Sequence, residues 1–428
     1  MKRRAFCISA SLLAAGSILS QSAMAQDTIK VGVLHSLSGT MAISETTLKD
    51  TILMMIDEQN KKGGLLGKKL QAVVVDPASD WPRFAEKAAQ LLEKDKVSVV
   101  FGCWTSVSRK SVLPVFEKNN GLLFYPVQYE GEESSKNVIY TGAAPNQQAI
   151  PAVDYLMKEV GVKRWVLEGT DYVYPRTTNK ILQAYLQAKG VKAEDISVNY
   201  TPFGHSDWQT RVAAIKRFGS AGKKTAVVST INGDANVPFY KELGNQKISA
   251  QDIPVVAFSV GEEELSGVDT KPLVGHLAAW NYFQSVSNPA NKAFIDKWRA
   301  FIKNNKRTSN DPMEAHYIGF NLWVKAVEKA KSTDVNKVLA ALPGLETPNL
   351  TGGVAKMLPN HHITKPVLIG EVKADGQFNV VWKSAGPVPG DAWSDFLPGS
   401  KDIEADWVTL NCGNFNKTTK KCSGQNYK

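Results

Sequence analysis

The feature that most constrains the fold of this 428-residue chain is a regular alternation of short apolar runs with longer amphipathic segments. In the first part of the chain, apolar runs at 29–34, 70–75, 97–101 and 122–125 alternate with helical patterns at 48–56, 84–92 and 107–116. Apolar runs of strand length that are separated by helices are typical of parallel sheets covered by helices on both faces. The alternation therefore predicts an α/β fold.

The alternation restarts after residue 150, which predicts a second α/β unit similar to the first. Its helical patterns fall at 152–160, 181–188, 212–218, 294–302 and 318–330, and its apolar runs at 165–167, 226–230, 255–258 and 277–282. Further on, runs at 366–372 and 378–382 flank Asp375-Gly376, a dipeptide typical of a hairpin turn. We expect two doubly wound lobes.

The composition is that of an ordinary globular protein, with 43% hydrophobic, 21% charged and 9% aromatic residues. These values exclude a disordered, collagen-like or coiled-coil chain. Of the net charge of +10, three charges belong to Lys2, Arg3 and Arg4, and four more lie in the tail from Asn411. Subtracting both leaves about +3 on the body of the protein, too little to indicate nucleic-acid binding.

Residues 1–25 have the pattern of a secretory signal peptide. A basic stretch at 2–4 precedes an apolar run at 5–19, and Ala23-Met24-Ala25 is a small-residue cleavage site. Arg3-Arg4 also resembles half of a twin-arginine signal, so the sequence leaves the export route open. Cys7 lies too early for a lipid anchor. We expect a periplasmic protein without a lipid anchor.

Recognisable catalytic motifs are missing from the sequence. It contains no phosphate-binding GxxxxGK[ST], no GxGxxG, no GxSxG and no HExxH. Only His361 and His362 are adjacent, and neighbours on an extended segment point to opposite faces, so they do not indicate a shared metal. Cys103 has no identifiable base and is interpreted as a small buried residue. We expect no enzyme activity, no metal and no cofactor.

Cys412 and Cys422 flank a tail rich in Gly, Asn and Lys. In an oxidising compartment such a pair favours a disulfide. The disulfide would cross-link a tail that has no hydrophobic core of its own.

The loops that follow the predicted strands are the candidate binding elements, because open α/β sheets bind ligands beyond the carboxyl ends of their strands. These loops are rich in aromatic, hydroxyl and acidic residues, and they span 35–39, 76–81, 102–106, 125–129, 169–174, 232–236 and 259–262.

Several strings in and beside these loops are long and specific. They are FGCWTS at 101–106, RK at 109–110, LPVF at 113–116, FYPVQYEG at 124–131, YTGAAPNQQ at 140–148, DYVYPR at 171–176, NGD at 232–234, AWNYF at 279–283 and DPMEA at 311–315. In these strings the chain closely resembles the urea and short-chain-amide substrate-binding proteins of ABC transporters, a branch of the branched-chain amino-acid-binding group. The resemblance covers nearly all of residues 28–385.

The resemblance implies a type I periplasmic binding protein fold, in which two α/β lobes joined by three crossovers close on a ligand. Lobe 1 is then expected to comprise residues 26–145 plus 281–350, and lobe 2 residues 146–280 plus 351–390. The crossovers are expected near Pro145, Trp280 and Gly352. Residues 391–428 lie outside the pattern and form a C-terminal extension.

The resemblance also implies a ligand, and the chemistry of urea agrees with the residues present. Urea is planar and neutral, with one acceptor oxygen and four N–H donors, so its site needs several acceptors. Asp234 and Glu262 are expected to accept from its amino groups, and either Ser106 or backbone N–H groups at the start of the helix after Trp104 to donate to its oxygen. Aromatic walls and neutral polar groups are expected from Trp104, Thr105, Tyr125, Val127, Gln128 and Tyr172.

Each of these residues also has a purely structural interpretation. Trp104 and Tyr125 are compatible with a lobe core, Asp234 with a helix N-cap, and Glu262 with a helix cap or a solvated position. Arg109 and Lys110 are interpreted as surface charges or as structural charges that bind no phosphate.

The expected function is that of a substrate-binding protein that captures urea and delivers it to ABC permease subunits. Three alternatives stay open: a receptor or binding protein for short amides such as acetamide or formamide, a branched-chain amino-acid-binding protein, and a secreted amide hydrolase. No nickel-type histidine cluster supports the last.

Overall fold

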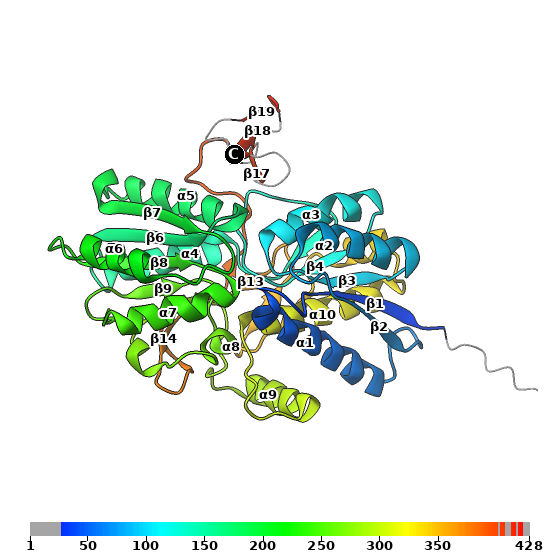
Figure 1. Ribbon diagram of the computed structural model, residues 1–428. Helices are drawn as coiled ribbons and strands as arrows, with labels where there is room; N and C mark the ends of the chain where they lie inside the picture. The colour runs from blue at the N-terminus through cyan, green and yellow to red at the C-terminus, as the bar shows by residue number, and fades with distance from the viewer. Residues whose placement is uncertain (1–26, 401–402, 407–411, 417, 423–428) are drawn as a thin grey trace, which may run out of the picture.

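The computed structural model describes residues 27–400, 403–406, 412–416 and 418–422. Figure 1 shows two α/β lobes side by side, with a small C-terminal sheet above the line where they meet. The predicted signal peptide, residues 1–25, lies outside the described residues. Within the described ranges, no helix is both long and apolar enough to cross a membrane.

The first lobe is built on a five-stranded parallel sheet in the order β2-β1-β3-β4-β5. Its strands are β1 (Ile29–Leu34), β2 (Leu70–Val75), β3 (Val99–Gly102), β4 (Leu123–Tyr125) and β5 (Val138–Tyr140). Its helices are α1 (Ala42–Lys61), α2 (Trp81–Ala89, continued by a π turn at 90–94), α3 (Ser106–Lys118), α9 (Pro289–Ile302), α10 (Asp311–Ala330) and α11 (Val335–Ala341). The first lobe also contains a hairpin of β11 (Glu346–Pro348) and β12 (Val354–Lys356).

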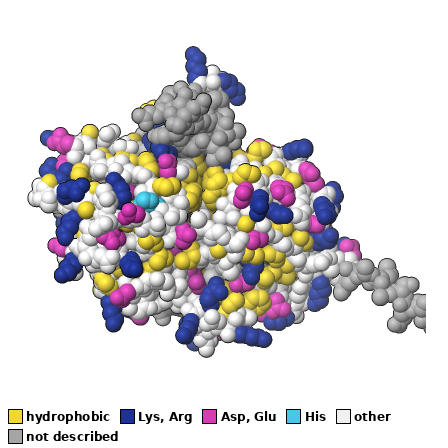
Figure 2. Space-filling model, in the orientation of Figure 1, with side chains coloured by type: hydrophobic (Ala, Val, Ile, Leu, Met, Phe, Trp, Pro, Cys, Tyr) yellow, Lys and Arg dark blue, Asp and Glu magenta, His cyan; other side chains and the backbone are white. Residues whose placement is uncertain are grey.

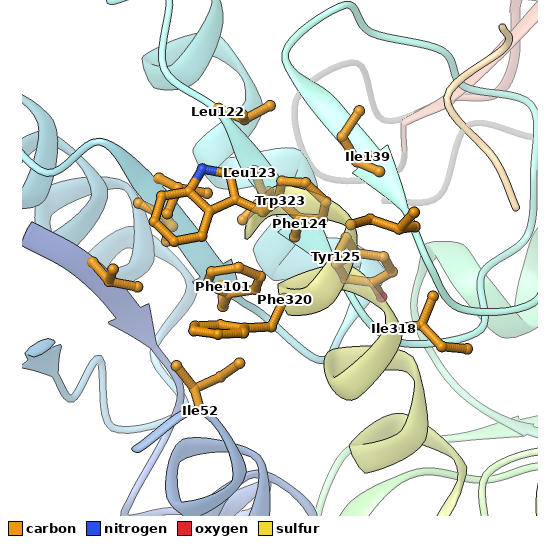
Figure 3. Close-up of a cluster of buried hydrophobic side chains, with 14 of the residues drawn as sticks. Ile52, Phe101, Leu122, Leu123, Phe124, Tyr125, Ile139, Ile318, Phe320 and Trp323 are labelled. Carbon is orange, nitrogen blue, oxygen red and sulfur yellow. The ribbon is translucent and has the colours of Figure 1, made fainter. Parts of the chain in front are cut away.

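The core of this lobe lies between the sheet and α10 (Figure 3). Phe101 of β3 stacks on Phe124 of β4 with ring centroids 5.2 Å apart, and Phe320 of α10 approaches Phe101 at 5.6 Å. All three side chains are buried. Tyr125 lies at the edge of this cluster, at the end of β4, so the packed core fixes the start of the loop that follows.

The second lobe is built on a seven-stranded sheet in the order β15-β14-β10-β9-β8-β6-β7, in which only β14 runs antiparallel to the other strands. Its strands are β6 (Arg164–Thr170), β7 (Ile196–Thr201), β8 (Thr225–Thr230), β9 (Val255–Ala257), β10 (Leu277–Trp280), β14 (Leu368–Val372) and β15 (Phe378–Lys383). Its helices are α4 (Ala149–Lys158), α5 (Val173–Ala188), α6 (Gln209–Gly219), α7 (Asn236–Asn245) and α8 (Glu262–Leu265), with short 3₁₀ turns at 145–147, 193–195, 233–235 and 271–273. These elements confirm the predicted α/β fold and the hairpin at Asp375-Gly376.

Three connections join the lobes. The first passes through 145–148 and the second through 281–288, close to the predicted positions. The third lies later than predicted: Leu350 and Ile363 pack in the core of the first lobe, and the chain enters the second sheet only at Leu368. The crossover expected near Gly352 is therefore found after Ile363, at β13 (Thr364–Lys365), which pairs with β16 (Val388–Pro389). The sequence prediction missed this because the β11–β12 hairpin folds back onto the first lobe.

A buried polar network ties the three connections to one another. The side-chain amide of Asn281 donates to the carbonyl oxygens of Gln147 at 3.0 Å and Pro366 at 2.7 Å. Beside it, the ammonium group of Lys365 lies 3.7 Å from Asp311 and 3.5 Å from Glu314. Burial raises the pKa of Glu314 to about 7, although the charge of Lys365 opposes this. One residue from each connection thus meets at the hinge.

The C-terminal extension forms a three-stranded antiparallel sheet of β17 (Ile403–Asp406), β18 (Cys412–Asn416) and β19 (Lys421–Cys422). The side chains of Cys412 and Cys422 lie outside the described part of the chain, so their disulfide stays a prediction. Cys103 is a buried free thiol, as the sequence predicted.

Candidate ligand cleft

The loops at the carboxyl ends of the strands in the two sheets face each other across the line between the lobes. In the first lobe these loops follow β3 and β4, and in the second they follow β6, β8 and β9. Open parallel sheets place their ligands at this edge. The predicted site residues Trp104, Thr105, Ser106, Tyr125, Val127, Gln128, Tyr172, Asp234 and Glu262 all lie on these loops or at the start of the helices that follow.

The turn from β3 into α3 is fixed by two local features. A Cβ atom at Gly102 would lie 2.3 Å from the carbonyl oxygen of Leu34, so only glycine fits there without displacing the backbone. The hydroxyl of Thr105 accepts a hydrogen bond from the backbone N–H of Ser108 at 3.1 Å and caps the first turn of α3. Thr105 thus acts as a helix cap, and Ser106 is held at the first position of the helix.

Arg109 lies one turn further along α3 and is buried, which agrees with a structural charge and not with a surface charge. Its guanidinium donates to Glu130 at 3.0 Å and to Glu133 at 2.8 Å, and Lys110, also buried, pairs with Glu133 at 2.7 Å. Ser106 donates to the carboxylate of Glu130. Burial alone would raise the pKa of Glu133, but Arg109 and Lys110 outweigh burial and hold it well below its usual range. The charges at this end of the first lobe therefore satisfy one another.

Aromatic side chains cover this charged network. The guanidinium of Arg109 lies 4.7 Å from the ring centroid of Tyr125 and 4.8 Å from that of Tyr129. The hydroxyl of Tyr125 donates to the backbone carbonyl of Trp104. Both Trp104 and Tyr125 are buried in the core of the first lobe, which agrees with their structural interpretation.

The second lobe contributes Tyr172 and Tyr174 to the opposite wall. With Val173 and with Val107 of α3, they form a small apolar cluster that bridges the two lobes. The ring of Tyr172 lies 4.8 Å from that of Phe203, and Tyr172 is only 7% exposed. The lobes are thus closed on each other at this point.

A direct polar contact crosses the cleft between Gln128 and Ser259. The side-chain amide of Gln128, after β4, donates to the hydroxyl of Ser259, after β9, at 2.7 Å. Both side chains are buried. Burial raises the pKa of Tyr174, and polar interactions with Ser259 and Gln128 partly oppose this, which places Tyr174 beside the same pair. Ser259 and Tyr174 were not singled out from the sequence.

Several buried polar atoms on these loops have no hydrogen-bond partner within the described residues, among them oxygens of Asn232 and Glu262. Three others are the indole N–H of Trp104, the side-chain oxygen of Gln128 and the hydroxyl of Tyr174. Leaving such groups unpaired is costly, and each one in a native structure needs an explanation. One is a donor, one an acceptor and one can be either, and all three are neutral. The arrangement is suited to a small neutral ligand that both donates and accepts.

The two predicted carboxylates are placed differently from the aromatic residues. Asp234 is exposed, and it contributes its backbone N–H to the carbonyl oxygen of Thr40 at 3.1 Å rather than a side-chain contact. Glu262 is buried and accepts from the backbone N–H of Gln284 at 2.7 Å, on the second connection. Within the described ranges, neither side chain bonds to the group formed by Ser106 and Glu130. Within the described residues, neither carboxylate is thus hydrogen-bonded to another of the predicted site residues.

The carboxylate that does cross between the lobes near these positions is Glu264. It accepts from the hydroxyl of Ser44, on α1, at 2.6 Å, and from the backbone N–H of Gly261 at 2.9 Å. The sequence prediction named Glu262 as an acceptor, and the structure turns one oxygen of that side chain toward Gln284 on the second connection. The described residues hold no group of three or more side chains suited to a metal ion.

Comparison with known proteins identifies the relatives of this fold. Residues 29–399 match the family described as periplasmic binding protein domain. The chain is 27% identical to the Leu/Ile/Val-binding protein BraC3 of Rhizobium johnstonii, over 77% of this chain and 88% of that protein. It is 25% identical to the Leu/Ile/Val-binding protein homolog 6 of Brucella melitensis, over 83% and 91%. A stretch of 125 residues is 32% identical to limonene hydroxylase of Geobacillus stearothermophilus and spans only 22% of that protein.

Solved structures share the whole architecture. The solute-binding protein of an ABC transporter from Rhodopseudomonas palustris HaA2, in complex with p-hydroxybenzoic acid, has a TM-score of 0.73 at 22% identity, over 85% of this chain and 98% of that one. The branched-chain amino acid transporter protein LivJ of Streptococcus pneumoniae, in complex with isoleucine, has a TM-score of 0.68 at 21% identity, over 85% and 100%. These likenesses establish the fold.

Proposed function

Because this chain belongs to the periplasmic binding protein family, we propose that it captures a small neutral amide, with urea as the preferred ligand, and delivers it to an ABC permease. The lobes close on the ligand about the three connections, and the closed form is the one that docks. Family membership and the relatives support the role in transport and the periplasmic location. The choice of ligand rests on the cleft.

The observation that carries the choice of ligand is the contrast between paired charges and unpaired neutral groups. Arg109, Glu130 and Glu133 are buried and satisfy one another. An amino acid presents a carboxylate and an ammonium group, so holding it with these side chains would mean breaking a buried ion pair, which typically costs about 3–5 kcal/mol. A neutral amide needs only the three unpaired groups on Trp104, Gln128 and Tyr174.

The size of the ligand limits the affinity. Urea has four heavy atoms, and the best small ligands gain about 1.5 kcal/mol per heavy atom. Binding is therefore limited to about −6 kcal/mol, which corresponds to a Kd on the order of tens of μM. Aromatic walls that exclude water, supplied by Tyr125 and Tyr172, help to approach that limit.

A branched-chain amino acid is the second candidate, because the relatives that match most of this chain are named for leucine, isoleucine and valine. For such a ligand the apolar cluster of Tyr172, Val107 and Phe203 would have to open to hold an aliphatic side chain. The closed packing of this cluster favours the smaller ligand.

The experiment is a calorimetric titration of the mature protein with urea, formamide, acetamide, leucine, isoleucine and 4-hydroxybenzoate under one set of conditions. Saturable heat with urea, weaker heat with acetamide and none with leucine supports the proposal. Heat with leucine or isoleucine alone would assign the chain to the branched-chain amino-acid binders. Ammonia released from urea during the titration would instead identify an amide hydrolase.

A further inference from the structure

Residues 388–400, here called the C-terminal strap, run from the hinge along the line between the lobes (Figure 1). At the hinge, the side chain of Gln147 donates to the carbonyl oxygen of Val388 at 2.7 Å, and Asn146 donates to that of Pro389 at 2.8 Å. Figure 2 shows hydrophobic side chains gathered in the middle of this face, where the lobes meet. The strap therefore starts beside the first connection between the lobes.

On the first lobe the strap is held by Glu132, in the loop between β4 and β5. The backbone N–H of Glu132 donates to the carbonyl oxygen of Ala392 at 2.6 Å. Its carboxylate accepts from the backbone N–H of Ser394 at 3.0 Å and from the hydroxyl of Ser400 at 2.7 Å. A Cβ atom at Gly131 would lie 2.5 Å from the Ala392 oxygen, so the loop and the strap are in direct contact.

On the second lobe the strap is held by Phe396. Its ring meets that of Tyr185, on α5, edge to face with the centroids 4.8 Å apart, and it packs against the core of that lobe. Beyond the strap, β17 and β18 lie beside the same helix. Lys180 precedes Tyr185 on α5 and lies close to Glu132. Burial lowers the pKa of Lys180, and the negative charge of Glu132 opposes this effect.

We propose that the C-terminal strap links the two lobes through Glu132 and Phe396 and limits how far the cleft opens, so that the ligand-free protein stays close to its closed form. Opening the lobes about the hinge would have to break either the contacts with Glu132 or the packing of Phe396. This inference rests on the proposed function only in taking the lobes to move relative to each other. If more of the ligand-free protein is already in the closed form, a smaller part of the binding free energy is used to close the lobes. The apparent affinity for the ligand is therefore higher.

The test compares Phe396→Ala with Phe218→Ala in the full-length mature protein without ligand. Phe218 is also half-buried, but it packs within the second lobe alone. Spin labels on p-acetylphenylalanine at positions 118 and 187, which are exposed on α3 and α5, leave the native cysteines unmodified. Pulsed electron paramagnetic resonance then reports the distance between the lobes.

The wild type and Phe218→Ala are expected to give one narrow distance distribution, and Phe396→Ala a broader one shifted to longer values. Ser400→Ala, which removes one donor to Glu132 and little volume, is expected to give a smaller shift in the same direction. Distributions that are the same in all four proteins, or a wild type that is already broad, would overturn the proposal. Since no ligand is present, failure to bind urea leaves this result unaffected.

Discussion

The two lobes share one architecture but bring opposite chemistry to the cleft. The first lobe presents a buried network of charges, with Arg109 bonded to Glu130 and Glu133 and covered by Tyr125. The second lobe presents neutral hydroxyl groups on Tyr174 and Ser259 and an aromatic face on Tyr172. The difference indicates that the first lobe forms a rigid floor whose charges are already paired, and that the polar groups left for a ligand are neutral ones from both lobes, Trp104 and Gln128 of the first and Tyr174 of the second.

The largest expected effect comes from breaking the network of the first lobe. Arg109→Ala leaves Glu130 and Glu133 buried with less compensation, which should cost about 3–5 kcal/mol of stability. For a chain of this size we expect the Tm to fall by roughly 5 °C in a calorimetric scan.

The matched control is Lys292→Ala, which breaks an exposed ion pair with Asp296 of 2.6 Å and should change stability by less than about 0.5 kcal/mol. Equal changes in Tm for the two substitutions would show that the ion pairs of Arg109 do not stabilise the first lobe.

On the second lobe the expected effect is on binding rather than on stability. Tyr174→Phe removes the unpaired hydroxyl and keeps the ring, so we expect the affinity for urea to fall about tenfold, or ~1.4 kcal/mol, with the Tm unchanged. Titration calorimetry and a thermal scan of the same samples measure both.

Tyr240→Phe is the control, because Tyr240 is buried in the core of the same lobe, against Phe239. If it lowers the affinity as much as Tyr174→Phe does, the hydroxyl of Tyr174 has no special role.

A pH-dependent effect is expected at Glu262. Burial raises its pKa from 4.5 in the unfolded chain to about 8 in the folded protein. The folded state thus binds the proton of Glu262 more tightly than the unfolded chain does. The protonated carboxyl therefore contributes its full share to the free energy of unfolding below about pH 4.5, and this share is lost as the pH rises through 8. Glu262→Gln should make the Tm fall less between pH 5 and pH 9 than in the wild type.

The same variant tests the position of Glu262 at the hinge. Because its carboxylate accepts from Gln284, we expect Glu262→Gln to leave the affinity for urea unchanged at pH 7. A tenfold loss of affinity would show instead that Glu262 contacts the ligand.

The smallest expected effect is that of Asp234→Ala. The side chain is exposed, and the contact with the first lobe is made by the backbone, so affinity should change less than about twofold. A titration in which binding drops by an order of magnitude would make Asp234 a direct ligand contact and would contradict the assignment of acceptors to neutral groups.

The parts of the fold that follow from local pattern were predictable from the sequence. The apolar runs at Ile29–Leu34 and Leu70–Val75 became β1 and β2 with the same bounds, and the Asp375-Gly376 turn joins β14 to β15 as expected. The strand at Ile196–Thr201 was missed because it lies at an edge of the sheet and alternates apolar with polar residues. Patterns of half-buried edge strands are weaker than those of buried ones.

The place of the candidate residues in the fold was predictable from the sequence, but the partners of their side chains were not. Trp104, Gln128 and Tyr172 follow strands and Tyr125 ends one, so they lie at the carboxyl edges of the two sheets. The burial of Arg109 was not predictable, because it depends on Glu130 and Glu133, which lie more than 20 residues further along the chain and approach only when α3 packs beside their loop. Likewise, Glu264 rather than Glu262 reaches Ser44 because of the way α8 is oriented.

The most direct test of the neutral-group account is a crystal structure of the protein with urea bound. The account predicts that urea accepts or donates hydrogen bonds with Tyr174 and Gln128 while Arg109 stays paired with Glu130 and Glu133. A structure in which the ligand binds Arg109 or Glu130 directly, with the Tyr174 hydroxyl still unpaired, would contradict it.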